Sequence, residues 1–186
     1  MIRSLLRHSH RLAFVAGIAI AGCSSIAYNH DFDPAVDFTK YKTYTWMEVA
    51  EPEKQRPRGM SELVEKRIVA AVDENLARKG YTKQATGPTD FVVNFMATTQ
   101  EKIDFTSYYT GWGYYGWYGG SQVVADQYTE GTLIIDIFDT GTKGLAWRGT
   151  GTGTVDPGAS AESRNLRIQE AVAGIFQRFP PGPPSQ

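Results

Sequence analysis

The chain contains one cysteine, Cys23, and this limits how the folded protein can be held together. A single thiol excludes disulfides within the chain and any metal site built from several cysteines. The fold must therefore be stabilised by a hydrophobic core without help from covalent cross-links. We expect one globular domain, large enough to bury such a core.

The residues before Cys23 predict where the protein resides. A basic start is followed by a continuous apolar run, residues 12–21, which is shorter than the roughly 20 residues that a membrane-spanning helix needs. Small Ala21 and Gly22 then precede the cysteine, as in the lipobox of bacterial lipoproteins. We expect residues 1–22 to be a signal peptide and Cys23 to become the lipidated first residue, with acyl chains such as palmitate.

Charge and lipid together indicate the compartment and the class of partner. The 164 residues from Cys23 onwards have a formal charge of −4, because the predicted signal carries three of the nineteen basic residues and none of the twenty acidic ones. This balance argues against nucleic acid as a partner. Each buried methylene contributes about 0.8 kcal/mol, so the lipid would attach the protein firmly to a membrane. Ser24 stands where an aspartate would favour the inner membrane, and we expect a periplasm-facing protein of the cell outer membrane, with the inner membrane as the alternative.

Turn-forming residues divide the mature chain into three parts. Residues 23–32, which include His30, are predicted to be a lipid-anchored tether. Aspartate and proline gather around its end, and residues of this kind mark turns. We expect a single folded domain over residues 33–181 and a disordered, proline-rich tail over residues 182–186.

The first half of this domain alternates between strand and helix patterns. Residues 43–47 are β-branched or aromatic, which predicts a strand. Apolar residues at three- and four-residue spacing then predict an amphipathic helix from its N-cap, Ser61, to about Lys79, with Gly80 in a left-handed cap position. Residues 90–98 alternate in polarity and predict a second strand.

The second half predicts a hairpin followed by a helix. Residues 132–139 and 144–155 form the hairpin, and Leu145 and Trp147 are expected on the face of the second strand that carries three alternating glycines. A final helix is expected over residues 160–179. The order of elements predicts a single α+β domain, with a mostly antiparallel sheet and two helices packed on one face.

Five short segments carry a resemblance to a known family. They are residues 37–46 (DFTKYKTYTW), Lys79-Gly80-Tyr81, Gly131-Thr132-Leu133, Trp147-Arg148-Gly149 and Phe179-Pro180-Pro181. Together they resemble the bacterial lipoproteins of domain-of-unknown-function family 4136, over about residues 33–181. The resemblance implies an envelope lipoprotein with an α+β fold. It implies no activity, because the family has no established catalytic residues.

Residues 105–120 (FTSYYTGWGYYGWYGG) hold eight aromatic residues and five glycines. The candidate binding residues are Tyr108, Tyr109, Trp112, Tyr114, Tyr115, Trp117 and Tyr118. Such rings can stack on sugars or insert into a protein or membrane surface. The alternative is that the segment folds back and covers the open face of the sheet. The exposure of Trp112 and Trp117 separates the two interpretations.

Two other groups of polar residues do not match known metal or triad sites. Asp31, Asp33 and Asp37 lack the glycine and the glutamate that a calcium-binding loop needs at fixed positions. We therefore expect them to cap turns. His30 is the sole histidine after the predicted cleavage, which excludes a catalytic triad or metal site built on several histidines.

Asp136 interrupts an apolar strand and has two possible explanations. With Glu130 or Asp126 it could supply the two carboxylates that a glycosidase holds about 5 to 9.5 Å apart. Nothing in the sequence spacing favours this. A cross-strand ion pair with Arg148 is the preferred interpretation.

These observations predict a non-enzymatic envelope lipoprotein without a cofactor. Its domain is expected to bind another envelope component, either a protein or peptidoglycan, through the aromatic segment. The alternative is a peptidoglycan-binding or glycan-binding domain, with a glycan-cleaving domain ranked below it. A third possibility is a structural or stress-related envelope protein with no single ligand.

Overall fold

The computed structural model describes residues 26–48, 60–109 and 121–182. Its strands are β1 (Ala27–Phe32), β2 (Thr43–Trp46), β3 (Thr82–Lys83), β4 (Phe91–Tyr109), β5 (Ser121–Asp139) and β6 (Leu145–Val155). Its helices are the short 3-10 helix η1 (Phe38–Lys40), α2 (Glu62–Arg78) and α3 (Ala161–Phe176). No helix in the described ranges is long and apolar enough to cross a membrane.

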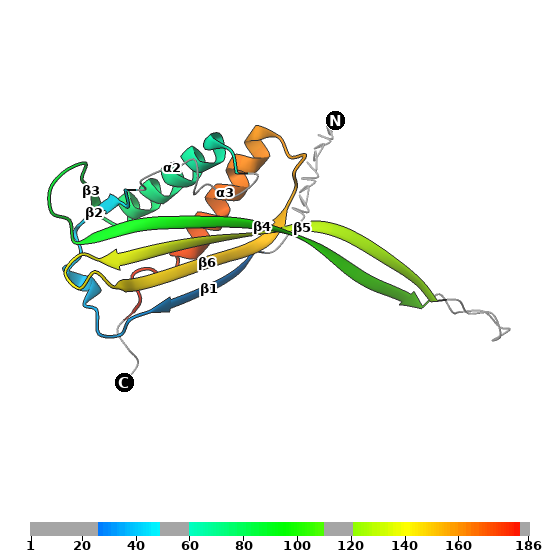
Figure 1. Cartoon of the computed structure of the whole chain (residues 1–186), viewed down its shortest axis with the longest axis horizontal. Helices are drawn as coiled ribbons and strands as arrows, with labels where there is room; N and C mark the ends of the chain where they lie inside the picture. The colour runs from blue at the N-terminus through cyan, green and yellow to red at the C-terminus, as the bar shows by residue number, and fades with distance from the viewer. Residues whose placement is uncertain (1–25, 49–59, 110–120, 183–186) are drawn as a thin grey trace, which may run out of the picture.

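The strands form one six-stranded sheet in the order β1-β6-β5-β4-β2-β3. The first four of these pair antiparallel, whereas β2 runs parallel to both β4 and β3. Both long helices lie on the same face of the sheet (Figure 1). The predicted α+β fold, with a mostly antiparallel sheet and two helices on one face, is confirmed.

The core lies between this face of the sheet and the helices. Buried side chains alternate along the strands, as Phe91 and Val93 do in β4 and Ile135 and Ile137 do in β5. The helices contribute Ile68, Ala71, Val72, Leu76, Val172, Ile175 and Phe176. Trp147 of β6 stacks on Phe176, with ring centres 5.8 Å apart. This cluster supplies the stabilisation that disulfides cannot give to a chain with one cysteine.

The first long helix agrees with its sequence pattern. The Ser61 side chain accepts a hydrogen bond from the Val64 backbone N–H, and Glu62 lies in the first turn. After the helix, Gly80 has a φ of +88°, a left-handed conformation that favours glycine. The predicted helix and its N-cap are confirmed.

The last helix is shorter than predicted. It ends at Phe176 and does not continue to Phe179. Pro180 disfavours helical backbone in the residue before it. Phe179 is instead buried in the core, where its ring centre lies 5.1 Å from that of Trp147.

The domain begins earlier than predicted. Residues 27–32, predicted to be part of a tether, form β1 at the edge of the sheet and pair antiparallel with β6. Tyr28 lies against Gly174 of α3, and its hydroxyl donates a hydrogen bond to the Glu170 carbonyl at 3.2 Å. The polar sequence of these residues lacks the apolar alternation that predicts a strand. An edge strand is paired on one side only and needs few buried residues. The predicted boundary at residue 33 is therefore wrong.

The glycines of β6 allow α3 to approach the sheet. A Cβ atom at Gly149 would lie 2.6 Å from Ile175 Cγ2 of α3, which is too close for any real side chain. The prediction that Leu145 shares the face of Trp147 is wrong. A break in register near the start of β6 leaves Leu145 exposed while Trp147 is buried.

Candidate functional site

The hairpin of β4 and β5 extends well beyond the rest of the sheet. β5 pairs with β6 only from Thr129 onwards, whereas its pairing with β4 continues to Tyr109 opposite Ser121. Residues 102–109 and 121–128 thus form a two-stranded ribbon, here called the arm, which projects away from the sheet (Figure 1). At about 3.4 Å per residue, its length is about 25 Å.

The base of the arm is polar. Lys102 Nζ lies 2.5 Å from Glu130 Oε1 on the facing strand. This hydrogen bond raises the pKa of Lys102. Ile103, the next residue of β4, is exposed. A ribbon of two strands buries little apolar surface, so the arm contributes little to the stability of the domain.

The described part of the predicted binding segment lies at the far end of the arm. Tyr108 and Tyr109 belong to the last residue pairs of β4 with β5. The remaining candidate residues lie outside the described residues, namely Trp112, Tyr114, Tyr115, Trp117 and Tyr118. Cys23, the predicted lipidation site, and most of the predicted tail also lie outside them. What the structure adds is the position of the residues that flank 110–120, because Tyr109 and Ser121 pair at the tip of the arm.

An apolar groove lies at the end of the sheet where the arm begins. The N-terminal halves of α2 and α3 form one wall. The other wall is formed by the middle of β4 and β5, where the arm begins, and by the C-terminal end of β6. Its main apolar side chains are those of Met60, Val64, Ile68, Leu133, Val155 and Ile168. Figure 1 shows that both helices lie farther from the sheet at this end than at the other. The groove has a volume of about 660 Å³, within the range of ligand sites.

Charged side chains at the rim of the groove are engaged by neighbouring protein groups. Arg164 Nη2 donates hydrogen bonds to the carbonyl oxygens of Pro157 and Ala159, at 3.3 and 3.1 Å. Arg167 Nη1 lies 2.9 Å from Glu170 Oε2. The groove therefore presents mainly hydrocarbon surface to a ligand.

The groove was not predicted from the sequence. Both helices were expected to pack on one face of the sheet, and periodicity does not distinguish the half of a helix that contacts a sheet from the half that diverges. The available signal was the set of strand glycines, since Gly131, Gly151 and Gly153 all line the groove. Their missing side chains leave room at its floor for neighbouring side chains, such as Ile26 over Gly151 and Arg167 over Gly153.

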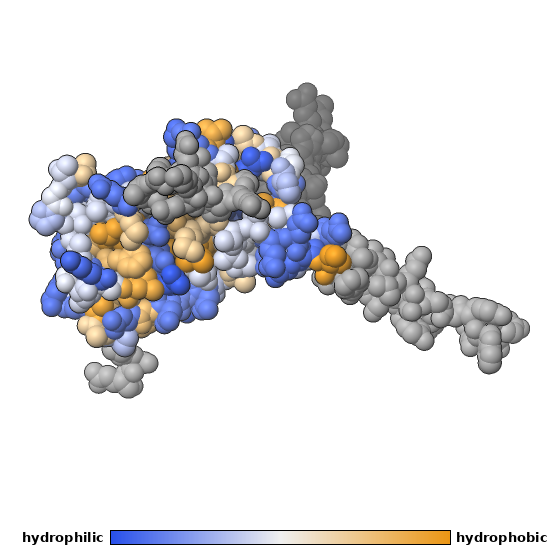
Figure 2. Space-filling model, in the orientation of Figure 1, coloured by the Kyte–Doolittle hydropathy of each residue, from blue (hydrophilic) through white to orange (hydrophobic). Residues whose placement is uncertain are grey.

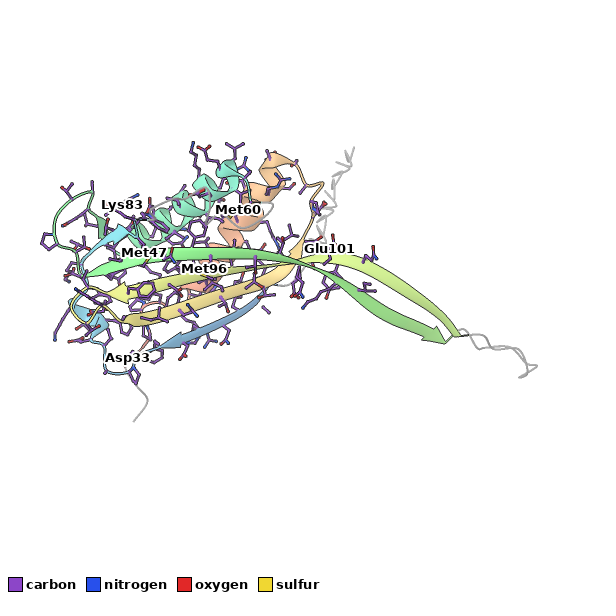
Figure 3. All side chains as sticks on the ribbon, viewed as in Figure 1. Asp33, Met47, Met60, Lys83, Met96 and Glu101 are labelled. Carbon is purple, nitrogen blue, oxygen red and sulfur yellow. The ribbon has the colours of Figure 1, made fainter. Side chains whose placement is uncertain are left out.

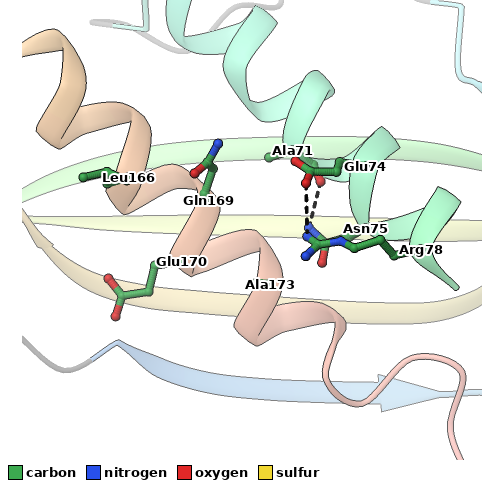
Figure 4. Close-up of a pocket in the computed structure, with 8 residues that line it drawn as sticks. All are labelled: Ala71, Glu74, Asn75, Arg78, Leu166, Gln169, Glu170 and Ala173. Atoms are coloured by element: carbon green, nitrogen blue, oxygen red, sulfur yellow. Dashed lines mark hydrogen bonds and ion pairs between the residues drawn. The ribbon is translucent and has the colours of Figure 1, made fainter.

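A smaller hollow of about 340 Å³ lies between α2 and α3 (Figure 4). Its charged residues Glu74 and Arg78 form an ion pair at 3.9 Å within one helix. The buried Asn75 side chain donates a hydrogen bond to the Ala71 carbonyl at 2.8 Å. Because these groups satisfy one another locally, the hollow has no set of polar groups directed at a ligand.

Asp136 forms the predicted ion pair. Its side chain is only 2% exposed, and Arg148 Nε and Nη2 donate hydrogen bonds to its two oxygens at 2.6 and 2.7 Å. Asp136 in turn raises the pKa of Arg148. The two residues face each other across β5 and β6, so the cross-strand interpretation is confirmed.

The alternative carboxylate pairs do not have the geometry of a glycosidase. Glu130 and Asp126 lie on the same strand as Asp136, at separations of about 20 and 34 Å for a rise of about 3.4 Å per residue. A glycosidase needs its two carboxylates less than about 10 Å apart. Glu130 is paired with Lys102 instead.

The acidic residues near the start of the domain bind backbone N–H groups. Asp33 Oδ1 accepts a hydrogen bond from Ala35 at 2.8 Å, and Asp37 Oδ1 accepts one from Thr39 at 3.2 Å. Hydrogen bonds from Thr39 lower the pKa of Asp37. The predicted turn and capping roles are confirmed for these two residues. Across the described ranges, no group of three or more His, Cys, Asp or Glu residues could hold a metal ion.

The sheet face opposite the helices carries an apolar patch. Figure 2 shows this face, with apolar residues gathered on the half away from the arm. Met96 of β4 is 47% exposed, and Met47, directly after β2, is also exposed (Figure 3). Ile134 and Phe138 of β5 are half-buried. This is the face that the aromatic segment would cover under the alternative interpretation of the sequence.

Comparison with known families identifies the domain. The family model described as Domain of unknown function (DUF4136) matches residues 28–181. The chain therefore belongs to this family, as the resemblance indicated. The match begins within β1, in agreement with the observed start of the fold. The curated proteins give no match to the chain.

Solved structures share the fold at low sequence identity. A PDZ domain protein from Parabacteroides distasonis is similar with a TM-score of 0.55 and 12% identity, over 85% of this chain and 36% of that chain. This chain thus spans about a third of the length of that structure. A PelC dodecamer from Paraburkholderia phytofirmans gives a TM-score of 0.47 and 11% identity, over 82% of this chain and 95% of that chain. At such identities the first likeness shows the fold alone, and no function follows from either.

Proposed function

We propose that this member of domain-of-unknown-function family 4136 is a lipid-anchored, periplasm-facing binding protein of the bacterial outer membrane. Its compact domain acts as a scaffold, and the aromatic end of its arm contacts another envelope component. The observation that carries the proposal is the arm, which holds the ends of the aromatic segment about 25 Å beyond the last pairing with β6.

The length of the arm favours contact with a partner over cover of the protein's own sheet. The segment 110–120 leaves the arm at Tyr109 and returns at Ser121, so only half of its length can extend in any one direction. Half of such a segment spans at most about 19 Å at 3.3–3.6 Å per residue. That is shorter than the arm, and Met96 lies farther back still, on the body of the sheet.

The position of the lipid fits the same account. Cys23 precedes β1 by a few residues only, since β1 begins at Ala27. Four residues span at most about 14 Å. An acylated Cys23 would therefore hold the domain close to the membrane surface, from which the arm extends toward its partner.

The full-chain lipoprotein in its own membrane would test the proposal through the variant Trp112→Ala/Trp117→Ala. We expect the wild-type protein to form a discrete complex with one envelope protein, detected on native gels of solubilised outer membranes. The double variant should lose this complex, because aromatic anchors dominate interfaces of this kind. Leu63→Ala/Leu166→Ala is the matched control, since both leucines are exposed on the helices.

The same variants distinguish a peptidoglycan partner from a protein partner. If the wild-type protein binds isolated sacculi and Trp112→Ala/Trp117→Ala does not, the partner is a glycan and not a protein. Complexes that survive the double substitution would remove the arm tip from the interface. Cleavage of purified glycan by the wild-type protein would contradict the non-enzymatic role.

A further inference from the structure

We propose that the groove between the sheet and the N-terminal halves of α2 and α3 binds an acyl chain of the lipid on Cys23 of the same molecule. The inference rests on the lipidation of Cys23 that forms part of the proposed function. It adds a lipid-binding site to the folded domain and a specific occupant for it.

The start of the described chain places the anchor next to the groove. Ile26 lines the groove and lies over the glycines of β6, with its side chain 3.5 and 3.3 Å from the positions of a Cβ at Gly151 and Gly153. Cys23 precedes Ile26 by three residues, which span at most about 10 Å. An acyl chain on Cys23 is therefore held within reach of the groove, and this tethering raises its local concentration.

The chemistry of the lining fits a hydrocarbon chain. The helices contribute Met60, Val64 and Ile168, and the strands contribute Leu133 and Val155. Removal of apolar surface of this kind from water is favourable. An acyl chain achieves this without needing a charged partner, which the arginines at the rim do not offer because neighbouring protein groups engage them.

The floor of the groove depends on glycines. A Cβ at Gly131 would lie 2.5 Å from Val155 Cγ2, and a Cβ at Gly153 would lie 2.9 Å from Arg167 Nη2. Any larger residue at these positions would displace the walls or fill the space. Gly153, like Gly149, leaves room for a side chain of α3 on the sheet. The charged, proline-containing sequence of residues 51–59 does not match such a lining.

Occupation of the groove would connect the anchor to the proposed contact surface. The groove and the base of the arm share one end of the sheet, and Thr99 and Thr129, which precede the arm in β4 and follow it in β5, line the groove. An acyl chain held there would fix the domain relative to the membrane. It would thereby also fix the direction in which the arm points.

The test uses the full-length lipoprotein, acylated in cells with a diazirine-bearing palmitate and purified in detergent micelles. The mass of the N-terminal peptide is measured first, and an unacylated Cys23 would overturn both this inference and the proposed anchor. After irradiation of the acylated protein, we expect cross-links to the peptides that contain Val64 and Ile168. Cross-links found only to detergent or phospholipid would overturn the proposal that the groove binds the acyl chain. They would leave the proposed lipid anchor on Cys23 intact.

Mixing unlabelled and isotope-labelled protein before irradiation shows which molecule supplies the acyl chain in the groove. Cross-links within one molecule support the inference, whereas cross-links between light and heavy molecules would overturn the same-chain occupant.

Two pairs of variants test whether the cross-linking depends on the space in the groove. Val64→Trp fills the groove and should reduce cross-linking to background, whereas Leu63→Trp, at a neighbouring residue that is 62% exposed, should not. Ile168→Trp and Leu166→Trp repeat the comparison on α3, where Leu166 is 59% exposed. Variants are compared only after their melting temperatures match. Equal cross-linking in a groove variant and its control would contradict the inference.

Discussion

The two halves of the β4–β5 hairpin differ in what surrounds them. The half formed by residues 91–99 and 131–139 carries the buried residues of both strands, with helices on one face and further strands on both sides. The other half is the arm, whose described pairing is limited to its own two strands. One continuous pair of strands therefore belongs to the packed sheet at one end and forms the projecting arm at the other.

This difference separates stability from the proposed binding role. Residues of the sheet body are fixed by contacts on several sides, so substitutions there change the free energy of unfolding. Residues of the arm have few such contacts, so their sequence is available for binding a partner. The following predictions test the separation, in order of decreasing effect on stability.

Trp147→Ala should cause the largest loss. The Trp147 ring is fully buried and contacts the rings of Phe176 and Phe179. Removing a large buried aromatic side chain costs about 3–5 kcal/mol. Urea denaturation measures the change, with Leu145→Ala on the same strand as control, expected within about 0.5 kcal/mol of wild type because Leu145 is exposed. Equal effects of the two substitutions would contradict the assignment of the core.

Arg148→Ala should have the next largest effect, because it leaves the buried Asp136 carboxylate without its partner. Breaking a buried pair costs about 3–5 kcal/mol, and we expect about 2 kcal/mol here since the Arg148 side chain is 44% exposed to water. Adding Asp136→Asn to the variant should restore part of the loss. Additive losses in the double variant, measured by the same denaturation, would exclude an ion pair as the cause.

Asp90→Ala should destabilise the junction of β2 and β4 by about 1–2 kcal/mol at pH 7. Asp90 Oδ2 accepts hydrogen bonds from the backbone N–H groups of Lys42 and Thr43, both at 2.8 Å. These bonds lower the pKa of Asp90 below its ordinary value of 3.8.

The pH dependence of this effect has a definite sign. A carboxyl group with a lowered pKa in the folded state stabilises the fold above its unfolded pKa and loses that contribution as pH falls through the folded pKa. The difference between wild type and Asp90→Ala should therefore be full above about pH 5 and shrink below about pH 4. Thermal unfolding at pH 3 and pH 7 measures it, and an unchanged difference would exclude the charged form as the cause.

Shortening the arm should have the smallest effect on stability. Replacement of residues 102–128 by Asn-Gly joins β4 to β5 through a favoured hairpin turn. The change removes the Lys102–Glu130 pair, which is partly exposed, and should alter the free energy of unfolding by less than about 1 kcal/mol. A large loss of stability, measured by urea denaturation, would show that the arm belongs to the folding unit.

The sequence predicted the parts of the fold whose local pattern and packing agree. The helix after Ser61 has a cap and a regular apolar stripe, and both appear in the structure. The partner of Asp136 could be predicted because a charge in an apolar strand needs a neighbour with the opposite charge. Edge strand β1 was missed because polar edge strands have no distinctive pattern.

The sites were harder to predict than the fold. The aromatic segment is visible as composition, but its position at the tip of an arm depends on how far β4 and β5 remain paired, and polar strand residues do not reveal this. The groove arises because two helices diverge from a sheet. Residues such as Val64 and Ile168 have the same spacing there as they would have in a closed core.

In-cell photo-crosslinking from two positions of the full-length protein tests the central claim most directly. A photoreactive amino acid is placed at Trp117, in the aromatic segment, or at Met96, which is exposed on the open face of the sheet body. The account predicts a discrete adduct to an envelope component from position 117 and none from position 96. An adduct from position 96 alone would contradict it and would move the binding surface to the open sheet face.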